Sequence, residues 1–183
     1  MLISITEAVQ QIKQGKVIAY PTESVYGLGC DPWNEQAFLK LLKLKGRALE
    51  KGVILIAANL DQVKDLAYIE NEEWSEQVIG SWKDSCQAVT WILPAKKTIP
   101  YWVTGGRDTV AIRVSHHPGV VALCNSLGSA LVSTSANLSK QLPAMNALDC
   151  SKIFPNVAIL AGKTMGLESP SQIWDAKSLI KIR

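Results

Sequence analysis

The sequence predicts an α/β fold: a twisted mixed β-sheet with helices on its flanks. Short apolar runs typical of buried strands alternate with segments that carry apolar residues at helical spacing. Some neighbouring strand segments have no helix between them, which favours a mixed sheet over a purely parallel one. The 183 residues fit one domain over residues 1–183, and 48% hydrophobic with 19% charged residues exclude a disordered or fibrous chain.

The chain opens with a helix and a strand. Ser4 and Glu7 have the spacing of a capping box, and Gly15 is placed to end the helix that they begin. Residues 17–20 form a short apolar run that stops at Pro21. A buried strand that runs into a loop has this pattern.

Later elements are predicted from the same signals. Asn34 is a suitable N-cap for a helix that ends near Gly46. Lys45 and Arg47 then lie at the C-terminal end of this helix. Further helices are predicted at residues 61–66, 72–79 and 118–127. Strands are predicted at residues 53–57, 88–93, 109–114, 130–133, 157–161, 172–174 and 179–182. Residues 96–106, rich in Pro, Gly and Thr, are predicted to form a mobile surface loop.

Charge and cysteine usage narrow the function classes. A net charge of +3 and a pI near 8.6 suit a polyanionic ligand but lie far below those of dedicated nucleic-acid binders. The four cysteines are scattered, so reduced thiols in a cytoplasmic protein are expected. The N-terminus has no basic start followed by a long apolar run, which predicts neither a signal peptide nor a membrane anchor.

Residues 21–29 are the first candidate site, because hydroxyls, a carboxylate and two glycines follow the end of a buried strand. Ligands of α/β sheets usually lie at that edge. Thr22 and Ser24 can bind a small polar substrate, and the glycines let a ligand approach the backbone. The alternative is an ordinary turn before a helix broken by glycine.

Lys45, Arg47 and Lys51 surround Gly46 and Gly52 between a helix and a buried strand. Arginine binds phosphate oxygens through two donors and lysine adds a compact charge, so this loop suits a triphosphate. The alternative is that these cations only compensate the helix dipole. Residues 133–139 form a dense cluster of hydroxyls and amides that can bind phosphate or equally cap a helix.

Two motifs do not carry chemistry. Residues 162–164 look like the end of a Walker A loop, but the earlier glycine that the loop needs is replaced by Val157. His116 and His117 point in different directions as neighbours and have no nearby ligating residue, so capping or peripheral roles are expected and no metal site is predicted. The six tryptophans have no period and are expected in the core or at its rim.

Taken in order, several short motifs resemble those of the YrdC family in its short bacterial single-domain form. They are residues 21–29, 45–47, 51–59, 111–114 and 133–137, and they span nearly the whole chain. The resemblance implies a large concave cleft lined by positive charge. It also implies an enzyme, a nucleotidyltransferase that joins L-threonine, bicarbonate and ATP into threonylcarbamoyl-adenylate and pyrophosphate, with Mg2+ as the expected cofactor.

The resemblance further implies a downstream transferase complex, which moves the threonylcarbamoyl group onto tRNAs that read codons starting with A. The family's Lys-x-Arg and Ser-x-Asn residues fall on Lys45, Arg47, Ser135 and Asn137, here expected to be catalytic. Its threonine- and nucleotide-binding positions fall on Thr22, Tyr26, Lys51, Thr90, Arg113 and Ser133.

The chain departs from the family pattern in places. The usual Pro-Gly-Pro-x-Thr loop keeps only Thr90 in residues 86–90, and Lys140 stands where a glycine is usual. Two other functions compete with the synthase. One is an RNA-binding module that uses the same cationic cleft, and its mark would be steep salt dependence. The other is a transfer subunit that binds an adenylate made elsewhere.

Overall fold

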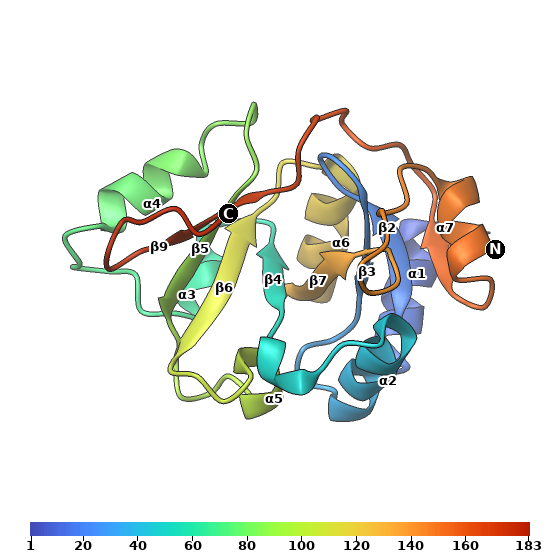
Figure 1. Ribbon diagram of the computed structural model, residues 1–183, viewed down its shortest axis with the longest axis horizontal. Coiled ribbons are helices and arrows are strands. Elements are labelled where there is room, and N and C mark those ends of the chain that lie inside the picture. The colour runs from blue at the N-terminus through green and yellow to red at the C-terminus, as the bar shows by residue number, and fades with distance from the viewer.

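A computed structural model describes all residues, 1–183, as one nine-stranded sheet with helices packed around it (Figure 1). The strands lie in the order β1-β8-β2-β3-β7-β4-β6-β5-β9. Their bounds are β1 Leu2–Ile3, β2 Ile18–Pro21, β3 Tyr26–Gly29, β4 Ile54–Ala57, β5 Val89–Pro94, β6 Thr109–Val114, β7 Leu131–Ser135, β8 Ala158–Leu160 and β9 Gln172–Asp175.

The sheet is mixed, as the sequence predicted. β1 and β2 pair with β8 in parallel, and β4–β6 and β5–β9 are the other parallel pairs. β3 is antiparallel to both β2 and β7, β7 is antiparallel to β4, and β5 is antiparallel to β6. Strands from both halves of the chain therefore alternate across the centre of the sheet.

Seven α-helices and a short 3-10 helix, Leu49–Lys51, complete the fold. The α-helices are α1 Ile5–Lys13, α2 Glu35–Lys45, α3 Leu60–Lys64, α4 Ser75–Ser81, α5 Tyr101–Thr104, α6 Pro118–Leu127 and α7 Ala147–Ile153. The predicted caps are confirmed: Ser4 and Glu7 form a capping box, and Asn34 accepts from the backbone of Ala37. No helix is long and apolar enough to cross a membrane.

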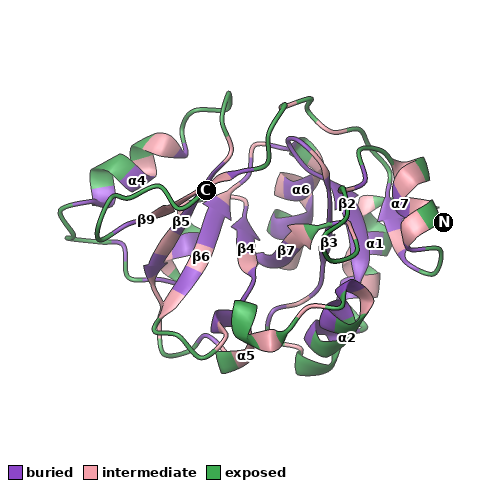
Figure 2. Cartoon of the chain, in the orientation of Figure 1, coloured by how far each residue is buried: buried purple, intermediate pink, exposed green.

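The strand side chains fill two cores, one on each face of the sheet, because successive residues of a strand point to opposite faces. In β4, Ile56 contributes to the core under α1 and α6, while Leu55 and Ala57 belong to the larger core that α2 covers. The central strands are almost entirely buried (Figure 2). A sheet covered on both faces explains the continuous apolar runs in the sequence.

Three sequence predictions need correction, and two elements were not predicted. Residues 26–29, expected in a loop, form strand β3, and residues 101–104 of the predicted mobile loop form α5. Residues 179–182 form no strand; they have one isolated bridge, between Trp174 and Lys181, and a few backbone hydrogen bonds to β9. Helix α7 and strand β1 had no predicted counterpart. β1 has only two residues, too few to show a period.

Candidate active site

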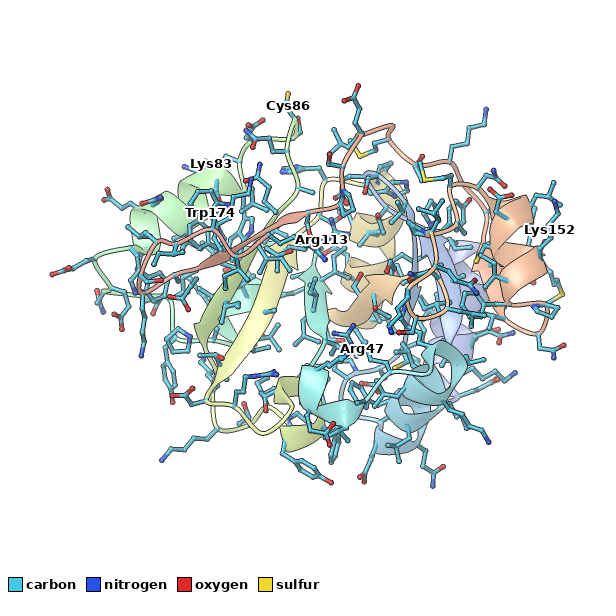
Figure 3. All side chains as sticks on the ribbon, in the orientation of Figure 1. Arg47, Lys83, Cys86, Arg113, Lys152 and Trp174 are labelled. Atoms are coloured by element: carbon cyan, nitrogen blue, oxygen red, sulfur yellow. The ribbon has the colours of Figure 1, made fainter.

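A cavity of about 570 Å3 lies between segments that are far apart in the sequence. Its wall combines the turn after β2, the loop between α2 and β4, the strands β6 and β7, and the C-terminal end of the chain. The residues that matter for chemistry are Thr22, Ser24, Arg47, Lys51, Arg107, Arg113, Ser133, Thr134, Ser135, Ser171 and Arg183. Figure 3 shows Arg47 near the start of β4 and Arg113 on β6.

The cavity is lined by five cationic side chains and by no carboxylate. The positive charges lie close enough to affect one another. The pKa of Arg47 is lowered by burial and, to a smaller extent, by the nearby guanidinium groups of Arg107 and Arg183. Like charges held together in a partly buried hollow favour an anionic ligand, because such a ligand relieves their repulsion. The arrangement therefore suits a polyanion such as a polyphosphate.

Lys45 joins helix α2 to the end of strand β7. Its ammonium donates to the Ser135 carbonyl, the Asn137 carbonyl at 2.9 Å and the Asn137 Oδ1 at 2.8 Å. The Ser135 hydroxyl donates to the same Oδ1 at 2.7 Å. Burial, with the charge of Arg47 as a smaller cause, lowers the pKa of Lys45 to about 8. The predicted group of Lys45, Ser135 and Asn137 is thus brought together.

Arg47 holds the loop that follows it. Its Nε and one terminal nitrogen donate to the Gly52 carbonyl at 3.2 and 2.9 Å. Gly52 has φ +59, in the left-handed region that favours glycine. Arg107 anchors the same loop from the other side, donating to the carbonyls of Glu50 and Thr104. The glycine and two arginines together fix the backbone around Lys51.

Glu23 connects the turn after β2 to the end of β6. Its carboxylate accepts from Arg113 at 2.8 Å and from the Ser115 hydroxyl at 2.6 Å, and both Glu23 and Arg113 are buried. Burial alone would raise the pKa of Glu23, but Arg113 and the hydrogen bonds lower it below its ordinary value. The pair is therefore ionised at neutral pH.

The structure places six of the ten predicted site residues in the cavity wall, namely Thr22, Arg47, Lys51, Arg113, Ser133 and Ser135. Lys45 and Asn137 lie directly behind Ser135. Tyr26 and Thr90 are not in the wall: the Tyr26 hydroxyl donates to the Gly162 carbonyl, and Thr90 donates to Ser171, which does line the cavity.

One alternative from the sequence is wrong: residues 133–139 cap no helix; they end β7 and continue as a turn. Lys45 lies in the last turn of α2, but compensation of the helix dipole is not its only role, because its ammonium binds three oxygens of Ser135 and Asn137. His117 is confirmed as the N-cap of α6, and it accepts from the backbone of Gly119.

Arg107 and Arg183 line the cavity and were missed by sequence reasoning. Arg107 directly follows Gly105 and Gly106, a local signal like the glycines beside Lys45 and Lys51, but that segment was predicted only as a mobile loop. Arg183 has no glycine or hydroxyl cluster beside it, so nothing local marks it. Arg183 reaches the cavity because the chain end pairs its backbone with Ile173 beside β9. Only the sheet topology brings these two guanidinium groups to the site.

A protein-built metal site is not formed by the residues present. No group of three or more His, Cys, Asp or Glu side chains is placed to hold a metal ion. The cavity wall has hydroxyl oxygens but no Asp or Glu side chain, the group through which proteins usually hold Mg2+.

The chain is similar to proteins of known name and known structure. A threonylcarbamoyl-AMP synthase of Hydrogenovibrio crunogenus is 52% identical over 100% of this chain and 98% of its own length. The structure titled P. abyssi Sua5 complexed with L-threonine is 28% identical with a TM-score of 0.86, over 94% of this chain.

This chain spans about half the length of that Sua5 chain, 51%. The structure of E. coli YciO, at 22% identity and a TM-score of 0.84, shows the same fold over 98% of this chain. A family model for Sua5, YciO and YrdC, described as Telomere recombination, matches residues 10–183. The chain therefore belongs to the Sua5/YciO/YrdC family.

Proposed function

We propose that this chain joins L-threonine, bicarbonate and ATP into threonylcarbamoyl-AMP and pyrophosphate. The observation that supports this most directly is the cavity that combines four unpaired cations with a row of hydroxyls and one arginine already paired to a carboxylate. The relative at 52% identity carries the name of this activity. The product would serve a transferase complex that modifies tRNA in the cytoplasm.

The chemical step is a displacement at the α-phosphorus of ATP. The threonine amine and bicarbonate first condense to a carbamate and release water. An oxygen of this carbamate then forms the new O–P bond, and the bond from the α-phosphorus to the bridging oxygen breaks as pyrophosphate leaves. Such a transfer needs little covalent help from the protein, so positioning and stabilisation of charge on phosphate oxygens supply most of the catalysis. This makes the reaction a nucleotidyl transfer.

The cavity residues take separate roles in this proposal. Arg47 and Lys51, with Arg107 and Arg183 beside them, stabilise the negative charge of the phosphates. Ser133 and Ser135 orient the nucleotide, and Lys45 with Asn137 holds Ser135 in place. Thr22 and Arg113 bind threonine. Tyr26 and Thr90 act from behind the wall, Tyr26 through Gly162 and Thr90 through Ser171.

Mg2+ is expected to bind together with ATP, but the side chains of the protein do not form a metal-binding site by themselves. The steps above are therefore assigned to the cations of the chain alone. Varying Mg2+ at fixed ATP, and measuring pyrophosphate, would show how far the activity depends on the metal.

The experiment that tests the function measures pyrophosphate release with ATP, L-threonine and bicarbonate, each left out in turn. Release should require all three. Release without threonine would contradict the proposal, and no release with all three would favour the transfer subunit. The RNA-binding module would instead show RNA affinity with a steep salt dependence and no turnover; the named relatives support synthase activity over this alternative.

A further inference from the structure

Glu23 is a buried carboxylate beside the cavity that accepts three hydrogen bonds. One carboxylate oxygen accepts from Arg113 at 2.8 Å, and the other accepts from the Ser115 hydroxyl at 2.6 Å and the His116 backbone N–H at 3.0 Å. Its exposed fraction is 2%. Glu23 does not line the cavity. It therefore acts on a ligand only through a neighbour.

That neighbour is Arg113, which does line the cavity. Its only hydrogen bond within the chain is the one to Glu23. No nitrogen of Arg113 is both fully buried and unpartnered, so the donors that Glu23 leaves free are accessible from the cavity. A guanidinium has five N–H donors in a fixed plane, so fixing one edge of the group aims the other.

The pairing also sets Arg113 apart from the other cations of the wall. Arg47, Lys51, Arg107 and Arg183 have no carboxylate partner, whereas Arg113 and Glu23 together are neutral. The unpaired cations match the several charges of a polyphosphate. A neutral pair that presents directed donors suits a single carboxylate, since it adds geometry with little extra charge.

The backbone around Glu23 is fixed as well. Its carbonyl accepts from the Leu167 N–H at 3.0 Å, and the Thr22 carbonyl accepts from the Met165 N–H at 3.3 Å. Thr22 and Ser24, on either side of Glu23, both line the cavity. The bond to Glu23 therefore ties Arg113 to the turn that carries these two hydroxyls.

We propose that Glu23 is a positioning residue, which holds the Arg113 guanidinium in the plane that binds the carboxylate of the amino-acid substrate. The inference rests on the proposed function, because it takes L-threonine as the ligand. The inference predicts different effects on the two substrates: loss of Glu23 weakens the binding of the amino acid and leaves the binding of ATP nearly unchanged.

The test compares Glu23→Gln, Glu23→Asp and wild type by pyrophosphate release, with KM measured separately for L-threonine and ATP. Glu23→Gln keeps the shape but loses the charge that fixes Arg113, and should raise the KM for threonine at least tenfold with less than a twofold change for ATP. Glu23→Asp restores the charge at a shorter reach and should recover part of the loss.

Glu70→Gln is the matched control, because Glu70 forms an exposed ion pair with Lys64 at the same 2.8 Å; both KM values should stay as in wild type. If Glu23→Gln does not fold, Ser115→Ala removes one of the three donors to the Glu23 carboxylate. It should raise the KM for threonine two- to fivefold.

Circular dichroism establishes that each variant is folded. A folded Glu23→Gln whose KM for threonine stays within twofold of wild type would overturn the inference, as would an equal rise of both KM values. A wild-type chain that releases no pyrophosphate with threonine would contradict the proposed function, and this inference would fall with it.

Discussion

Lys45 has a structural role in the site, because its ammonium binds the end of β7 and the turn that follows. Lys45 is 5% exposed, and its ammonium donates three hydrogen bonds, all to oxygens of Ser135 and Asn137. An ammonium has three N–H donors, so none is left free. A phosphate would have to displace one of these bonds. Lys45 therefore supports the turn that presents Ser135, while Arg47 and Lys51 face the cavity.

Replacing Lys45 with alanine should impair both stability and turnover. The three oxygens lose their donor, which should lower the free energy of unfolding by about 1–3 kcal/mol. Displacement of Ser135 should cost about 2–4 kcal/mol of transition-state stabilisation, comparable to the loss of one preorganised donor. Urea unfolding and pyrophosphate release measure the two effects. Lys43→Ala, an exposed lysine of the same helix, is the control; equal behaviour of the two variants would contradict the assignment.

The ion pair of Glu23 and Arg113 should make the free energy of unfolding depend on pH in the acidic range. The folded pKa of Glu23 is lowered, so the unfolded chain binds the proton first as pH falls. The stabilisation is complete above the ordinary pKa of about 4.3 and is lost as pH falls through the lower folded value. At pH 7, Glu23→Gln should be less stable by about 3–5 kcal/mol because Arg113 is left buried and unpaired.

Unfolding of wild type and Glu23→Gln in urea, at pH 7 and at pH 3, checks this prediction. The difference between them should shrink in acid, because at pH 3 Glu23 of the unfolded wild-type chain is protonated, so wild type gains less from forming the ion pair on folding. A difference that is the same at both pH values would show that the ion pair is not its source.

At the scale of elements, strand β3 shows where sequence patterns fail. Its residues Tyr26-Gly27-Leu28-Gly29 contain two glycines, which are depleted in strands, so the pattern indicated a loop. The structure explains the glycine at 29: a Cβ there would lie 2.3 Å from the Val132 carbonyl and 2.7 Å from the Tyr20 ring. Glycine allows β3 to fit between its two neighbours in the sheet.

Gly29→Ala should therefore destabilise the chain by about 3 kcal/mol or more, since a buried strand must shift to admit the methyl group. Gly80→Ala is the matched control. Gly80 lies in α4 with nothing within 4 Å of the added Cβ. There, alanine should stabilise the protein by about 0.5–1 kcal/mol. Chemical denaturation of both variants tests the pair, and a Gly29→Ala variant as stable as wild type would contradict the account.

Elements with strong local signals were predictable. The capping box at Ser4 and Glu7 and the N-cap at Asn34 place the starts of α1 and α2 within a residue, because capping depends on side chains a few positions apart. Residues 179–182 have a strand-like apolar pattern and turn back along β9, where the Ile180 carbonyl accepts from Asp175 and the Ile182 N–H donates to Ile173. Only Lys181 forms a bridge, with Trp174, so this pairing does not extend into a strand. Local propensity does not set how far two segments pair.

For the whole molecule, the cavity depends on the sheet order. β7 lies between β3 and β4, so Ser133 and Ser135 come to lie beside the loops from the first third of the chain. The segment after β8 then crosses to β9 and carries Ser171 and Arg183 to the same hollow (Figure 1). One anionic ligand would therefore touch segments from both ends of the chain and hold them together.

Pyrophosphate should accordingly raise the melting temperature. A ligand at a hundredfold excess over its Kd adds about 2.7 kcal/mol, which for a chain of this size corresponds to about 5–10 °C. The shift should shrink in high salt, which screens the cations. Arg183→Met should lose most of it, while Lys83→Met should keep it, because Lys83 is an exposed lysine just after α4 and is not in the cavity wall (Figure 3). Thermal unfolding measures the shift, and equal shifts in both variants would argue against binding in this cavity.

The sequence by itself determined the α/β class, the mixed sheet and the boundaries of α1, α2 and α6, which follow from local patterns of apolar residues, caps and turn residues. The family resemblance, also taken from the sequence, indicated the segments that carry the site. The tertiary structure alone decided which side chains face the cavity. It turned Lys45, Tyr26 and Thr90 toward partners within the protein and added Arg107 and Arg183 to the wall. Side-chain direction at a site depends on which distant strands become neighbours, and no local pattern encodes that.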